Sequence, residues 1–160
     1  MRTETITLYQ FDELSDDAKQ KALEWLREAQ EYPWFEEAMD SCKAFCDVFG
    51  VSVKDWSLGG YRYSFVNTDA SPSHFRGFTL KQALRLTDSS LTGYCLDYDL
   101  TQTFYESFKN SGDAYEAFTD ALQAFCLAVE KDIEYTFSNE ALAEWGQCNG
   151  FEFLESGKKA

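Results

Sequence analysis

The alternation of apolar and polar positions divides the chain into short helices and strands. Residues 5–11 alternate with a period of two, which is typical of a half-buried strand. Ser15 precedes two acidic residues as an N-cap does, and the helical period behind it predicts a helix over about 16–31. A second helix is predicted from Pro33, as a first-turn residue, to Gly50, which ends the apolar stripe. We expect these two helices to form an antiparallel pair.

The middle of the chain predicts a hairpin. Two β-like runs, 51–58 and 61–66, flank the dipeptide Gly59-Gly60, because glycine tolerates the positive φ angles of a tight turn. The polar residues 67–78 that follow are predicted to form a surface loop.

The next segments differ in the strength of their patterns. A short helix is predicted over 79–86, with Thr79 as its N-cap. Residues 93–99 favour an extended conformation, and 101–110 favour a short helix. The strongest helical pattern of the chain covers 113–137.

The last third of the chain completes the predicted fold. Asp113 and Glu116 are spaced as a capping box at the start of the long helix. Ser138 begins a further short helix, and a turn leads into a last strand over 151–154. The elements predict a single α+β domain over 1–160, in which a small, mainly antiparallel sheet packs against several helices and one long helix lies in the C-terminal half.

Acidic side chains outnumber basic ones two to one. There are 28 Asp and Glu residues against 14 Lys and Arg, and the formal net charge is −14. This charge disfavours direct binding to nucleic acid or to an anionic membrane surface, so we expect a basic macromolecular partner. The sequence has no bilayer-length apolar run, no signal-peptide core at its start and an odd set of five cysteines, and we therefore expect a cytoplasmic protein.

The acidic excess lies outside the middle of the chain. Residues 1–50 carry 12 acidic and 5 basic side chains, residues 101–160 carry 11 and 4, and residues 51–100 carry 5 of each. On the long predicted helix, Glu116 and Asp120 are four positions apart, with no cation three or four positions from either of them.

This carboxylate row has two interpretations. It is either a solvated face that keeps the protein soluble, or a surface for a basic protein groove, on which carboxylates about 5–10 Å apart imitate nucleic-acid phosphates. Under the second interpretation the partner-binding residues are Asp113, Glu116, Asp120, Glu36, Glu37 and Asp40.

One fragment suggests metal chemistry instead. The carboxylates of Asp97 and Asp99 flank Tyr98 and would hold Mg²⁺ together with a third acidic residue. In a short strand both carboxylates face solvent on the same side. A metal-dependent enzyme centred on these two residues is an alternative to a binding protein.

The other motifs indicate no catalysis. The only histidine, His74, lies in a polar stretch without a recognisable nucleophile. Cys42 and Cys46 share an apolar helix face, which indicates core positions, and lack the further ligands of a zinc site. Gly59-Gly60 lacks a phosphate-binding pattern. We therefore predict no catalytic residue, no bound metal and no cofactor.

Four stretches resemble one known family. They are 8–22, 55–61, 91–99 and 151–158, which include the sequences LYQFDELSDD, DWSLGGY, LTGYCLDYD and FEFLESGK. In them the chain is similar to small proteins of tailed bacteriophages and prophages, some of which are labelled as antitoxins of toxin–antitoxin systems. The resemblance implies a phage or mobile-element origin and assigns no functional residues.

The implied origin and the acidic charge together set the expected function. Acidic inhibitors and nucleic-acid mimics recur among phage proteins, so we expect a non-enzymatic inhibitor of a basic, nucleic-acid-binding host defence protein, such as a CRISPR or restriction complex, in the bacterial cytoplasm. The alternatives are the metal-dependent enzyme, an antitoxin that neutralises a toxin, and a phage structural or assembly protein.

Overall fold

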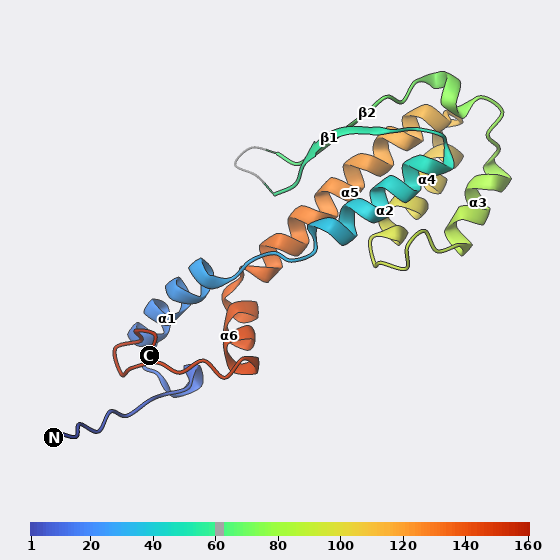
Figure 1. The fold of residues 1–160 in the computed structure, drawn as a ribbon. Helices are drawn as coiled ribbons and strands as arrows, with labels where there is room; N and C mark the ends of the chain where they lie inside the picture. The colour runs from blue at the N-terminus through green and yellow to red at the C-terminus, as the bar shows by residue number, and fades with distance from the viewer. Residues whose placement is uncertain (60–62) are drawn as a thin grey trace. The chain divides into compact units, whose positions relative to one another are not determined.

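The computed structural model describes residues 1–59 and 63–160 (Figure 1). The chain divides into two compact units, of which the first comprises residues 1–32 with 133–160 and the second residues 33–132. Helices dominate, and two strands form a small antiparallel sheet, which confirms the predicted α+β class. The single domain stays a prediction.

The first unit is built on helices α1 (Asp16–Ala29) and α6 (Asn139–Cys148), which pack on each other. Both begin at the predicted serine N-caps, because the hydroxyl oxygens of Ser15 and Ser138 each accept a backbone N–H from three residues further along. The short 3-10 turn η1 (Phe11–Glu13) precedes α1. The local signals in the sequence therefore predict both helix starts correctly.

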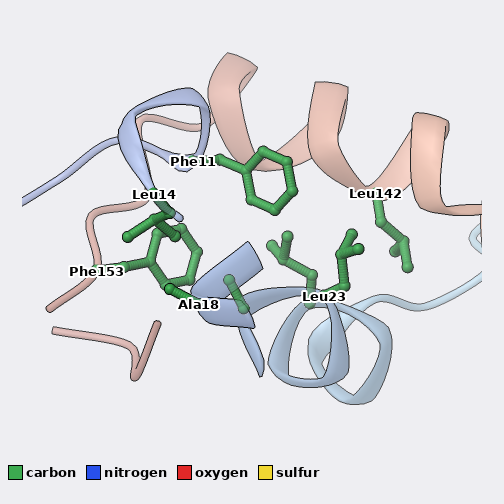
Figure 2. Close-up of a cluster of buried hydrophobic side chains, with 8 residues drawn as sticks. Phe11, Leu14, Ala18, Leu23, Leu142 and Phe153 are labelled. Atoms are coloured by element: carbon green, nitrogen blue, oxygen red, sulfur yellow. The ribbon is translucent and has the colours of Figure 1, made fainter. Parts of the chain in front are cut away.

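Apolar side chains from both parts of the first unit share one core (Figure 2). Its buried members are Phe11, Leu14, Ala18, Ala22, Leu23, Leu26, Leu142 and Phe153. Trp25 packs against this core with its ring edge-on to Phe151 at 5.3 Å and to Phe153 at 6.2 Å. The core thus holds the chain's first 32 residues to its last 28.

The strands predicted at 5–11 and 151–154 are wrong. The structure has isolated bridges there: Tyr9 pairs with Phe153 through two reciprocal backbone hydrogen bonds of 2.8 Å, and Phe153 also pairs with Lys159. Residues 1–8 are exposed and belong to no strand. A period-two pattern forms a strand only where a neighbouring strand supplies its hydrogen bonds, and in the part of the chain that the structure describes no such neighbour lies along residues 1–8.

Helices also form the core of the second unit. They are α2 (Phe35–Val48), α3 (Leu80–Asp88), α4 (Asp97–Ser111) and α5 (Ala114–Thr136). Five of the six rings at their centre, those of Phe45, Phe49, Phe75, Phe104 and Phe118, are buried, and Phe78 is partly buried. Helices α3 and α5 confirm the predictions at 79–86 and 113–137.

Phe75 corrects the surface loop predicted over 67–78. It lies in the 3-10 turn η2 (Pro72–Phe75), and its ring packs 5.1 Å from that of Phe118. Phe78, in the same stretch, packs 4.9 Å from Phe49. The polar residues that surround these two aromatic anchors dominate the composition, so the composition predicts a loop.

A ring contact and the electrostatic influence of Cys126 on Cys42 agree on the direction of α2 along α5. Phe45 stacks on Phe118 at 5.5 Å. One turn earlier in α2, a hydrogen bond to Cys46, burial and the neighbouring Cys126 all raise the pKa of the Cys42 thiol. Earlier positions of α2 therefore lie beside later positions of α5, and the two helices run antiparallel (Figure 1).

A two-stranded sheet completes the second unit. Strand β1 (Val53–Ser57) pairs antiparallel with β2 (Phe65–Thr68), which confirms the predicted hairpin. The second strand begins four residues later than the predicted start at residue 61. Residues 60–62, and with them part of the predicted Gly59-Gly60 turn, lie outside the described residues.

Two expectations about the helices are corrected, and the predicted antiparallel pairing of the first two helices stays a prediction. Helix α1 packs against α6 in the first unit, and α2 packs against α4 in the second. Helix α2 has Trp34 as its N-cap, and Pro33 therefore precedes the helix. Residues 97–99 begin helix α4 instead of continuing an extended segment over 93–99.

Candidate functional site

Asp113 caps the start of α5. Its Oδ1 accepts the backbone N–H groups of Tyr115 at 3.0 Å and Glu116 at 3.2 Å. The backbone N–H of Asp113 donates to Ser111 Oγ at 3.1 Å, so the reciprocal bond of the predicted capping box comes from Ser111 and not from Glu116. The capping bonds leave Oδ2 of this exposed carboxylate for other partners.

Asp120 has a partner that its helix neighbours do not reveal. Its Oδ2 accepts the hydroxyl hydrogen of Ser107, on α4, at 2.6 Å, and the side chain is partly buried. This bond joins α4 to α5 and compensates in part for the absence of a cation three or four positions from Asp120 on α5. Asp120 is therefore a structural residue first and a candidate contact residue second.

Glu116 is the most available carboxylate of this group. It is exposed, and the only Lys or Arg on α5 is Lys131. Positions 113, 116 and 120 follow the three- and four-residue spacing of one helix face, on which neighbouring side chains are about 5–6 Å apart. The structure thus brings the three predicted residues together in a row centred on Glu116, and we call them the α5 acidic row.

The other three predicted residues form a separate group. Glu36, Glu37 and Asp40 are exposed on the first turns of α2, where negative charge favours the helix N-terminus. Because α2 and α5 are antiparallel and Phe45 lies beside Phe118, this group is displaced from Glu116, the centre of the α5 acidic row, by about 10–17 Å along the helix axis. The six residues therefore form two groups instead of one continuous surface.

A groove of about 380 Å³ lies beside the α5 acidic row. Its lining comes from the β2 segment and from α5, namely Tyr63, Ser64, Phe65, Val66, Thr68, Ala70, Tyr115, Phe118, Thr119, Leu122 and Gln123. Sequence reasoning missed it. The four-residue spacing of Tyr115, Thr119 and Gln123, a stripe without charge on an acidic helix, was the available signal.

Asp97 is the most heavily hydrogen-bonded carboxylate of the second unit. It is only 8% exposed, and its Oδ2 accepts the backbone N–H groups of Leu91, Thr92 and Gly93 at 3.0, 2.9 and 2.8 Å. Its Oδ1 lies 3.3 Å from Thr92 Oγ1, which donates to it. The carboxylate therefore clamps the preceding loop onto the first turn of α4.

The electrostatics of this clamp favour the charged carboxylate. Burial alone raises the pKa of Asp97, but hydrogen bonds from the Ser41 hydroxyl and from the backbone N–H groups of Thr92, Gly93 and Leu91 outweigh it and hold the pKa below its ordinary value. Donors from the chain itself surround the ionised group, and this fits a structural role.

Asp97 and Asp99 do not form the predicted pair of neighbouring carboxylates. The two residues are two positions apart on α4, and at 100° per residue they lie on opposite sides of the helix. This corrects the expectation, based on a strand, that both face the same side. Burial raises the pKa of Asp99, against a smaller lowering by a backbone hydrogen bond and by Lys131. Within residues 1–59 and 63–160, no group of three or more His, Cys, Asp or Glu side chains is arranged to hold a metal ion.

We expect Mg²⁺ or Mn²⁺ to leave the melting temperature unchanged. A specific site would raise the melting temperature by mass action, and the Asp97 carboxylate has its acceptor positions occupied by the chain. The measurement is a thermal shift series in which ionic strength is held constant with NaCl. A saturable rise that Asp97→Asn abolishes would contradict this expectation.

His74 serves the local turn. Its Nδ1 accepts the backbone N–H of Ser71 at 3.0 Å and lies 3.1 Å from Ser71 Oγ. One ring nitrogen of the only histidine is therefore engaged in η2.

Membrane-spanning character and similarity to known proteins are the remaining points. Among the described residues, no helix combines the length and the apolar character needed to cross a membrane. No family model, curated protein or solved structure matches the chain.

Proposed function

We propose that this protein acts by binding, without catalysis, to a basic surface of another protein through the α5 acidic row. The resemblance to phage proteins suggests the partner, a nucleic-acid-binding defence protein of a bacterial host. In the host cytoplasm, the protein inhibits this partner by occupying its nucleic-acid-binding site.

The observation that carries this proposal is the exposed Glu116 at the centre of the row. Asp113 and Asp120 lie one turn to either side of it, and these carboxylate spacings are close to those of phosphates along a nucleic-acid strand. Since both neighbours are held by hydrogen bonds within the chain, the row is preorganised and loses little entropy on binding.

Exposed aromatic rings lie close to the same face. Tyr115 is 37% exposed next to Glu116, and Tyr63, across the groove, is 71% exposed. Tyrosine supplies large, rigid contact area and is enriched among the residues that dominate interface energies. These rings favour the interpretation of the acidic row as a protein-binding surface over its interpretation as a solvated face.

Glu116→Lys is expected to abolish capture of the partner from host lysate. The substitution puts a positive charge at the centre of the row, against a basic surface. The measurement is an affinity pull-down at about 50 mM and about 500 mM salt, where screening shortens the range of charge–charge attraction from over 10 Å to about 4–5 Å. We expect the wild-type protein to capture a basic protein at the lower salt concentration and to release it at the higher one.

Glu144→Lys is the matched control. It makes the same change in net charge at an exposed position of α6, in the other unit. Equal loss of capture with both variants would mean that net charge alone matters. Undiminished capture with a folded Glu116→Lys variant would overturn the proposed site.

A further inference from the structure

The groove beside the α5 acidic row lies between β2 and α5. Six of its lining residues come from β2 and its flanks and five from α5, while none of the described residues of β1 lines it. β1 pairs with one edge of β2. Among the described residues, no strand pairs with the other edge.

Two hydrogen bonds that flank β2 indicate which of its backbone groups face away from β1. Just beyond the strand, the backbone N–H of Asp69 donates to Ser52 O at 3.1 Å, towards the β1 side. Backbone groups alternate in direction along an antiparallel strand, so those of Phe65 and Asn67 face β1 as well. The groups of Val66 then face the opposite edge.

A contact on the groove side agrees with this alternation. The backbone N–H of Ser64, two positions before Val66, donates to Glu130 Oε1 of α5 at 2.8 Å. Ser64 therefore points towards α5, and Val66 and Thr68 follow the same direction. The Ser64 bond shows that this strand edge accepts a hydrogen-bonding partner on the side of α5.

We propose that an extended, basic segment of the partner protein enters this groove and adds to β2 as a third strand. The inference rests on the proposed function and specifies the mode of binding. Backbone groups of Val66 and Thr68 pair with the segment, and its apolar side chains face Phe118 and Leu122 on the floor of the groove.

The charges around the groove select a cationic segment. Its lining contains no Lys or Arg among the described residues. Glu116 lies at its rim, because it is seven positions before Gln123 and shares that side of α5. Glu130 lies at the end where Ser64 meets α5. An alternating segment therefore places lysine or arginine near these carboxylates and apolar residues inside.

The test uses a defined probe, an end-blocked octapeptide of alternating lysine and valine, titrated into the isotope-labelled protein and followed by amide NMR. We expect the largest shifts at Val66 and Thr68. A second octapeptide, N-methylated at alternate residues, keeps the charge but cannot form a ladder, and we expect it to bind about tenfold or more weakly.

Two variants locate the binding on the groove. Thr119→Arg fills it and adds a repelling charge, and we expect about a tenfold loss of affinity for the peptide. Leu127→Arg makes the same charge at an exposed position of α5 outside the lining, and affinity should stay within about twofold. Circular dichroism and melting temperature verify that both variants fold.

The outcomes separate this inference from the proposed function. Equal binding of the methylated peptide, or equal effects of the two variants, would overturn strand addition and leave binding through Glu116 intact. Shifts confined to the first turns of α2 would overturn it as well. Partner capture that is indifferent to Glu116→Lys would overturn the proposed function itself.

Discussion

Asp97→Asn is expected to lower the free energy of unfolding by about 3 kcal/mol. The carboxylate is buried and accepts three backbone N–H groups with Oδ2. The asparagine amide carries no charge, so the remaining hydrogen bonds are weaker. Its NH₂ group also replaces one carboxylate oxygen, so it faces N–H or O–H donors that need an acceptor. Urea unfolding measures the loss, and hydrogen exchange should show faster opening of the loop before α4.

Asp99→Asn is the control at a neighbouring position. Because burial raises the pKa of Asp99, its charge is unfavourable in the folded state, and neutralising it should leave stability within about 0.5 kcal/mol or increase it slightly. Equal destabilisation by the two substitutions would contradict a specific clamp at Asp97.

The clamp also predicts a pH dependence. The pKa of Asp97 in the folded state lies below its ordinary value, so its contribution to stability is fully present above the unfolded-state pKa of about 4. The contribution is lost as the pH falls through the lower, folded-state pKa. The wild-type protein should therefore lose more stability than Asp97→Asn when the pH is lowered below about 4.

Gly157→Ala is expected to destabilise the first unit by about 3 kcal/mol or more. Gly157 has a φ of +88°, and a Cβ there would overlap the carbonyl oxygen of Ala18 and lie 2.8 Å from its carbonyl carbon. The obstacle is helix backbone, which does not rotate away as a side chain does. Hydrogen exchange across α1 and the C-terminal residues measures the loosening.

Gly150→Ala separates the effect of space from that of backbone conformation. Gly150 has a similar φ of +67°, but an added Cβ would meet no atom within 4 Å, so only the cost of the left-handed conformation applies, about 1–2 kcal/mol. If Gly157→Ala cost no more than Gly150→Ala, the close approach of residue 157 to α1 would not contribute to stability.

Helix starts were predictable because their signals are local. Ser15, Thr79 and Ser138 each cap a helix through a bond to a backbone N–H three positions ahead, a geometry contained in a few consecutive residues. The period of the apolar stripes then located the buried faces, including Cys42 and Cys46.

Strands and polar clusters were less predictable because their partners are distant in sequence. Tyr9 pairs with Phe153, and nothing near residue 9 encodes that partner. The extended pattern predicts a solvent-facing Asp97, because its hydrogen-bond donors lie in an irregular loop that the pattern does not reveal. An alternating pattern cannot distinguish a paired strand from an exposed segment.

The candidate site was predictable in its residues and not in its arrangement. Composition and spacing select Glu116 and its neighbours on α5. The bond from Ser107 to Asp120 crosses between helices, and the separation from Glu36 follows from the direction of α2 along α5. Both depend on tertiary packing, as does the groove beside the row.

The discontinuity of the first unit has a consequence for synthesis on the ribosome. Its two parts are separated by residues 33–132, which take about 5–20 s to translate at typical rates. During that time α1 has been made, but Leu142 and Phe153, which cover its apolar face, have not. A nascent chain therefore presents an apolar helix face to chaperones at the ribosome until its last residues emerge.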